Sequence, residues 1–175
     1  TGHLPYSTLA DLMRALMGLQ PDIDPNRERE RGRVAVADWG SSGHRHLDAA
    51  TDLLDLAPLG AEWLALTASQ RRVRIGEAFL WLVRRQIAEG PLMVVVEDVH
   101  RADRDSLRML ESIWRLLGDL PVLLCVTYRQ DFVHRWAEAA WFEEHWIGPL
   151  PQSDMMRLAD ALLGRHESLA WPSAR

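Results

Sequence analysis

Two adjacent carboxylates at the end of an apolar run are the residues of this chain best suited to chemistry. Glu97 and Asp98 follow five apolar residues at 92–96, three of them valines. A continuous apolar run rich in β-branched residues predicts a strand, over 92–97, that is buried on both faces. Carboxylates there are costly to bury unless they bind something, and a hydrated magnesium ion beside a nucleotide phosphate is the usual ligand. From spacing alone, an ordinary acid pair that caps the next helix or pairs with arginine is equally favoured.

A second strand is predicted over 122–128, and polar residues such as Thr127 follow its apolar part. Between the two strands, 104–117 has helical apolar spacing, with Asp103 as its N-cap. A strand, helix and strand of this length form a βαβ crossover, which makes the strands parallel. Ligands of open parallel sheets bind beyond the carboxyl ends of the strands, so the acid pair and Arg129 are predicted to face one crevice. Spacing alone favours Arg129 as a surface residue that closes the strand.

The elements that must position these residues are mostly helices. Apolar residues at helical spacing predict further helices, over 7–19, 46–56, 69–88 and 153–164. Ser7 and Ser69 are the predicted N-caps of the first and third of these. Segment 20–46 lacks an apolar period and is predicted to be a mobile surface connection. The tryptophan-rich stretch 132–147 is predicted to pack as a helix with large aromatic side chains.

Composition excludes several classes of function. All twenty basic residues are arginine, so the chain has no G-x-x-x-x-G-K-[ST] phosphate loop and no lysine for Schiff-base chemistry. The formal net charge of −5 argues against direct contact with nucleic acid. Cys125 is the only cysteine, so no internal disulfide forms, which fits a reducing cytosol. No signal peptide or apolar run of membrane-spanning length is present, and we expect a cytoplasmic protein without membrane contact.

One resemblance to a known family covers nearly the whole chain. Residues 92–103, LMVVVEDVHRAD, resemble the extended Walker B motif of the STAND-type AAA ATPases. These signalling modules occur in bacterial LuxR-like and MalT-like regulators and beside class III adenylate cyclase domains. Arg101 stands where the family commonly has tryptophan. The segments 122–129, 146–150 and 66–72 are similar to the family's sensor strand, to the stretch before its lid helices and to the helix before Walker B.

The resemblance implies an α/β fold, the three-layer sandwich with a parallel sheet of P-loop NTPases, here without its first, phosphate-loop strand. It implies that residues 1–148 are a partial nucleotide-binding domain and that 149–175 begin a helical lid. This chain would then be an interior piece of a longer protein.

The resemblance also implies roles for individual residues, with ATP and Mg²⁺ as cofactors. Glu97 would hold the magnesium ion through water, although many NTPases have aspartate there. Asp98 would orient the attacking water, and Arg129 would be the sensor arginine near the γ-phosphate. Gly148 and Pro149 would lie near the adenine.

Three functions are consistent with these features of the sequence. The first is part of an ATP-hydrolysing signalling switch, whose partners are ATP, other domains of the parent protein and further copies of itself. On this hypothesis the parent is an ATPase, and the chain alone is inactive because it has no Walker A lysine. The second is a degenerate module that binds proteins and no nucleotide. The third, an unrelated phosphate-handling enzyme, has no Gly-rich loop, nucleophile elbow or metal-ligand cluster to support it.

Overall fold

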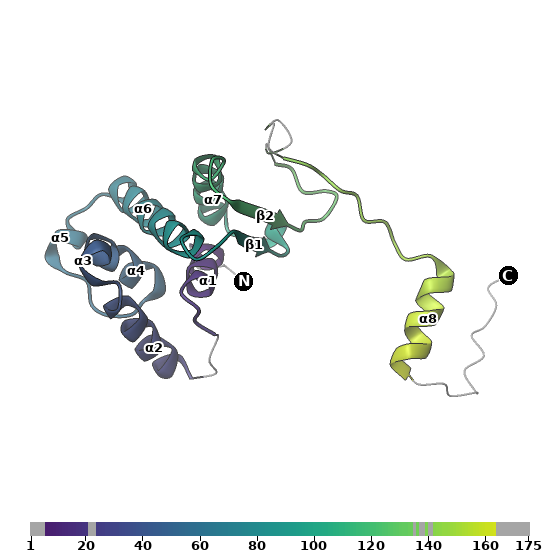
Figure 1. The fold of residues 1–175 in the computed structure, drawn as a ribbon, viewed down its shortest axis with the longest axis horizontal. Helices are drawn as coiled ribbons and strands as arrows, with labels where there is room; N and C mark the ends of the chain where they lie inside the picture. Colours follow the sequence, from purple (N-terminus) through teal and green to yellow (C-terminus); the bar gives the residue numbers. More distant parts are fainter. Residues whose placement is uncertain (1–5, 21–23, 135, 137–138, 140–141, 164–175) are drawn as a thin grey trace. The chain divides into compact units, whose positions relative to one another are not determined.

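The computed structural model describes residues 6–20, 24–134, 136, 139 and 142–163. The chain divides into two units, the first ending at Val133 and the second starting at His134. The first unit contains both strands and all the described helices except α8 (Figure 1).

A two-stranded parallel sheet confirms the predicted βαβ crossover. Strand β1 (Leu92–Val96) pairs in register with β2 (Val122–Val126), so that Val96 lies opposite Val126. Between them run the 3-10 turn η2 (Val99–Arg101) and helix α7 (Arg104–Leu116). The described chain is thus an α/β protein that consists mostly of helices.

One face of this sheet is covered and the other is bare. Val94 and Val96 are each 6% exposed and point toward the helices, and α6 packs against β1. On the opposite face Met93, Val95 and Leu123 are 50–62% exposed. The prediction of strands buried on both faces is therefore wrong for the described residues, because helices cover one face only. The continuous apolar sequence had suggested a second covering layer.

The core lies where α1 (Ser7–Leu16), α6 (Ala68–Ile87) and α7 pack on one another. Its most deeply buried side chains are Leu9, Met13, Phe79, Val83, Leu110 and Ile113. The stripes predicted from helical spacing account for these residues, but the two predicted caps are wrong. Thr67 caps α6 through a capping box with Gln70, in place of Ser69. Tyr6, in a left-handed conformation, occupies the N-cap position of α1 in place of Ser7.

Helices occupy most of the segment 20–46 that was predicted to be a mobile connection. Helix α2 (Pro25–Ala37) starts from Asp24, whose side chain accepts a hydrogen bond from the backbone of Asn26, and Pro25 takes the first helical position. Only Gly32 and Val36 are buried along α2, so its sequence has no apolar period. Its contact with α4 therefore stabilises the helix without leaving a signal in the sequence pattern.

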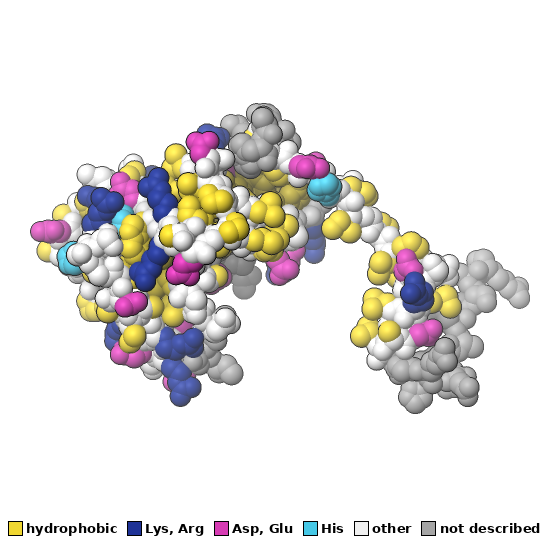
Figure 2. Space-filling model, in the orientation of Figure 1, with side chains coloured by type: hydrophobic (Ala, Val, Ile, Leu, Met, Phe, Trp, Pro, Cys, Tyr) yellow, Lys and Arg dark blue, Asp and Glu magenta, His cyan; other side chains and the backbone are white. Residues whose placement is uncertain are grey.

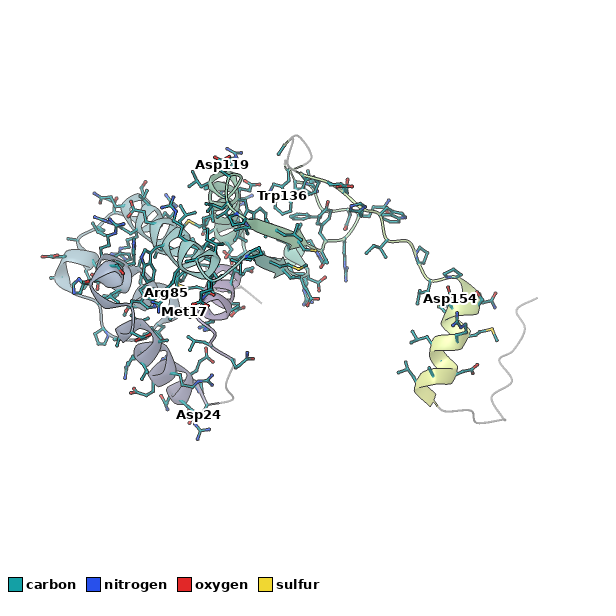
Figure 3. The ribbon with its side chains drawn as sticks, viewed as in Figure 1. Met17, Asp24, Arg85, Asp119, Trp136 and Asp154 are labelled. Atoms are coloured by element: carbon teal, nitrogen blue, oxygen red, sulfur yellow. The ribbon has the colours of Figure 1, made fainter. Side chains whose placement is uncertain are left out.

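Four shorter elements complete the first unit: α3 (Gly40–Gly43), η1 (His44–His46), α4 (Leu47–Leu54) and α5 (Ala61–Leu64). An aromatic cluster lies beside η1 and α6, where the rings of Trp39 and His46 lie 4.8 and 5.6 Å from the ring of Trp81. Arg85, labelled in Figure 3, stacks over Trp81 at 5.8 Å. His46 is 2% exposed. Its burial, reinforced by the positive charge of Arg45, lowers the pKa of its imidazole.

The second unit contains a small aromatic cluster and helix α8 (Gln152–Leu163). His134 stacks on Trp136 at 4.7 Å, and Phe142 lies edge-on to His134. Residues 142–150 are not helical, so the predicted packed helix over 132–147 is wrong there; Trp141 lies outside the described residues. Apolar side chains of α8 remain exposed within the unit (Figure 2), among them Met155, Met156 and Leu162.

Candidate functional site

The carboxyl ends of the two strands are joined at Thr127. The backbone N–H of Thr127 donates to the Val96 carbonyl at 3.1 Å, and its own carbonyl accepts from Val99 N–H at 2.9 Å. Its hydroxyl accepts a third bond, at 2.9 Å, from the backbone N–H of Asp98. These bonds continue the parallel ladder beyond β1 and β2. They fix the position of the backbone that carries the acid pair.

Asp98 stands where the chain leaves the sheet. Its backbone is in the left-handed region, at φ 50° and ψ 40°, which is uncommon for a residue other than glycine. The turn is anchored by Val99, which is 0% exposed. The side chain of Asp98 is 61% exposed, and its carboxylate lies 3.8 Å from Arg101 Nη1 and 3.9 Å from His100 Nδ1. The turn therefore presents the carboxylate to solvent at the sheet end.

Glu97 and Arg129 lie beyond the carboxyl ends of β1 and β2. Glu97 directly follows β1, and Arg129 lies two residues beyond Thr127. Both side chains are exposed, and neither forms an ion pair or a hydrogen bond within the part of the chain that the structure describes. The structure thus brings the acid pair and the arginine to the same end of the sheet. It leaves Glu97 and Arg129 available to a ligand.

Glu97 and Asp98 are residue types that a hydrated magnesium ion would use. Among the described residues, no group of three or more His, Cys, Asp or Glu side chains is placed to hold a metal. Nucleotide-associated magnesium typically uses one or two carboxylates, and takes its other ligands from water and phosphate. Glu97 and Asp98 supply that number. No lysine or Gly-rich loop of this chain could hold the phosphates themselves.

Asp103 caps α7, as predicted, and also binds the residues at the start of α1. It accepts bonds from the Ser106 backbone at 2.8 Å and hydroxyl at 2.6 Å, which confirms the cap. It also accepts from Tyr6 N–H at 3.0 Å and from the Ser7 hydroxyl at 3.3 Å. Ser106 Oγ in turn accepts from Leu9 N–H at 3.2 Å. Asp103 therefore ties the start of α1 to the start of α7, and no sequence pattern signals a contact so distant in the chain.

Hydrogen bonding keeps Asp103 ionised. Partial burial opposes its charge, but the bonds from Ser106, Tyr6 and Ser7 outweigh burial and hold the pKa of its carboxyl below the ordinary value.

Gly148 and Pro149, predicted to lie near an adenine, belong to the second unit and are exposed. Their placement near a nucleotide stays a prediction. No helix among the described residues is long and apolar enough to cross a membrane.

Comparison with known proteins finds one similar curated sequence and does not place the chain in a family. An "Uncharacterized protein" of Rhizobium meliloti (strain 1021) is 34% identical to this chain over 105 residues. The match covers 58% of the chain but only 10% of that protein, so the chain spans about a tenth of its relative's length. No family model matches the chain, and no solved structure matches it.

Proposed function

We propose that this chain is the Walker B and sensor part of an ATP-hydrolysing signalling module with a P-loop NTPase-like fold, and that the phosphate-loop strand lies outside it. The observation that carries the proposal is the junction at Thr127, which holds Asp98 beside the end of a parallel neighbour that leads to Arg129. Parallel α/β sheets bind ligands at this end.

Each residue of the site then has a task that its surroundings permit. Glu97, unpaired among the described residues, would hold a magnesium ion. Asp98 orients the water that attacks the γ-phosphate, and its backbone is fixed by the Thr127 hydroxyl. Arg129 contacts the γ-phosphate as it accumulates charge. Magnesium, when bound, neutralises part of the phosphate charge.

The exposed face of the β1–β2 sheet supports the proposal that a further layer of the fold lies outside this chain. Parallel sheets are normally covered on both faces, whereas Met93, Val95 and Leu123 are exposed here. Both outer edges of the described sheet are also unpaired, since β1 and β2 pair only with each other. A further strand and helix from the parent protein would cover these groups. The matched segment makes up only 10% of the similar Rhizobium meliloti protein, which agrees with a module inside a longer protein.

The alternative is a degenerate module that acts by protein contact alone. The absence of lysine favours it, as does Arg101 at the family's tryptophan position. The exposed apolar residues of the sheet and of α8 would then contact a protein partner.

Phosphate release from ATP distinguishes the two. The protein is expressed with its native flanking sequence, and Asp98→Asn is compared with Asp119→Asn, a matched change at an exposed carboxylate after α7 (Figure 3). We expect Asp98→Asn to lower the hydrolysis rate by about 100-fold or more while ATP binding is kept, and Asp119→Asn to leave the rate unchanged. Equal rates in the two variants would refute the role of Asp98. A wild-type protein that releases no phosphate and binds no ATP would support the degenerate module.

A further inference from the structure

A cleft of about 510 Å³ lies in the first unit between α4, the start of α6 and the residue before α1. This volume is within the range of about 300–1,000 Å³ that is typical of small-molecule sites. Leu53, Leu66 and Ile75 line it with apolar side chains, and Tyr6 adds an aromatic ring. Neither the acid pair nor Arg129 is among the lining residues, so the cleft is separate from the candidate ATP site.

Two neighbouring arginines give the cleft its charge. Arg71 is held in place because its Nη2 donates to the Leu64 carbonyl at 3.0 Å. Its Nε is buried and has no hydrogen-bond partner among the described residues. This buried Nε is out of reach of a ligand, but Arg71 lines the cleft and its positive charge acts on a ligand there. Arg72 is exposed and forms no ion pair within the described chain.

Other groups at the cleft narrow the kind of ligand. The arginines belong to the first turns of α6, a 20-residue helix whose N-terminal end carries partial positive charge. Asp52 of α4 also lines the cleft and has no ion-pair partner among the described residues. Its negative charge disfavours a second anionic group, and the apolar wall disfavours a purely ionic ligand.

We propose that this cleft binds a small organic anion, a carboxylate or a phosphate monoester with a compact apolar body. Arg72 binds the anionic group, since guanidinium donors match the oxygens of carboxylates and phosphates, and the charge of Arg71 attracts it. Leu53, Leu66 and Ile75 cover the apolar body. This proposal does not depend on the proposed ATPase function.

Nuclear magnetic resonance titration of the chain as it stands tests the site. The probes are phenyl phosphate and phenylacetate. Two further probes serve as controls: inorganic phosphate lacks the apolar body, and benzyl alcohol lacks the charge. We expect saturable shifts of the Arg72 Nε–H resonance with one or both of the first two probes, and at least about 10-fold weaker binding of inorganic phosphate and benzyl alcohol. The tighter binding of phenyl phosphate or of phenylacetate shows whether the cleft prefers a phosphate or a carboxylate. Equal binding of inorganic phosphate, or no saturable shift with any probe, would overturn the proposal.

Paired variants separate ligand binding from a general effect of charge. Arg72→Gln is expected to weaken binding by about 10-fold, the value of one charge-assisted hydrogen bond. Arg84→Gln makes the same change at an exposed arginine near the other end of α6 and should leave binding unchanged. Asp52→Asn removes the opposing carboxylate and should tighten binding. Equal weakening by the two arginine variants, or weaker binding in Asp52→Asn, would contradict the assigned geometry.

Discussion

Replacement of Asp103 by alanine is predicted to destabilise the fold, because it removes the hydrogen bonds that tie the start of α1 to the start of α7. The two bonds from Ser106 are N-cap interactions, whose loss costs about 0.5–2 kcal/mol. The bond from Tyr6 N–H is charge-assisted, and its loss leaves a partly buried donor without an acceptor, at about 1–3 kcal/mol. The longer bond from Ser7 adds less. Together these values predict a loss of about 1.5–5 kcal/mol from the free energy of unfolding.

Urea denaturation, followed by tryptophan fluorescence, measures this loss. The matched control is Asp105→Ala, which removes an acid from the same first turn of α7 but breaks no hydrogen bond among the described residues. It should cost no more than about 1 kcal/mol, through the helix dipole alone. If Asp103→Ala costs as little as Asp105→Ala, Asp103 does not tie α1 to α7 and our reasoning is wrong.

The charge of Asp103 gives the same prediction a pH dependence. Because its pKa is lower in the folded protein than the ordinary 3.8, ionised Asp103 stabilises the fold above that pH. This contribution is lost as the pH falls through the folded-state pKa. The stability difference between the wild type and Asp103→Asn should therefore shrink below about pH 4. A difference that stays constant with pH would mean that the charge itself contributes nothing.

Three further changes test other parts of the fold. Thr67→Ala should lower the free energy of unfolding by about 1 kcal/mol and Ser69→Ala by less, since Thr67 caps α6; equal losses in urea denaturation would contradict that cap. Because burial lowers the pKa of His46, the folded protein should lose stability as the pH falls below 6.5, and His46→Phe should abolish this dependence in thermal melts; an unchanged pH profile would count against a buried neutral imidazole. Val94→Thr should be far more destabilising than Val95→Thr, because only Val94 faces the helices; similar melting temperatures would mean that the sheet is covered on both faces.

Local signals predicted the central βαβ unit. The apolar runs, the helical spacing of 104–117 and the cap at Asp103 each depend on residues close together in the chain, and the structure confirms all three. Helix α2 was missed because it is stabilised through the small buried positions Gly32 and Val36, which give no apolar period.

The candidate site was predictable only in part. Strand ends of a parallel pair meet at one edge, so the proximity of Asp98 to the end of β2 followed from topology. The bond from Tyr6 to Asp103 spans 97 residues and depends on tertiary packing alone. The bare face of the sheet was also unpredictable, since the same valine-rich run suits a strand covered on one face or on both.

Stabilisation by ATP tests the central claim most directly. The melting temperature of the protein, expressed with its native flanking sequence, is measured with ATP in the presence and absence of magnesium. At ATP 100-fold above its dissociation constant, binding should add about 2.7 kcal/mol to the free energy of unfolding. We predict that this gain requires magnesium and is reduced in Glu97→Gln. A melting temperature that ATP and magnesium leave unchanged would contradict the assignment of Glu97, Asp98 and Arg129 to an ATP site.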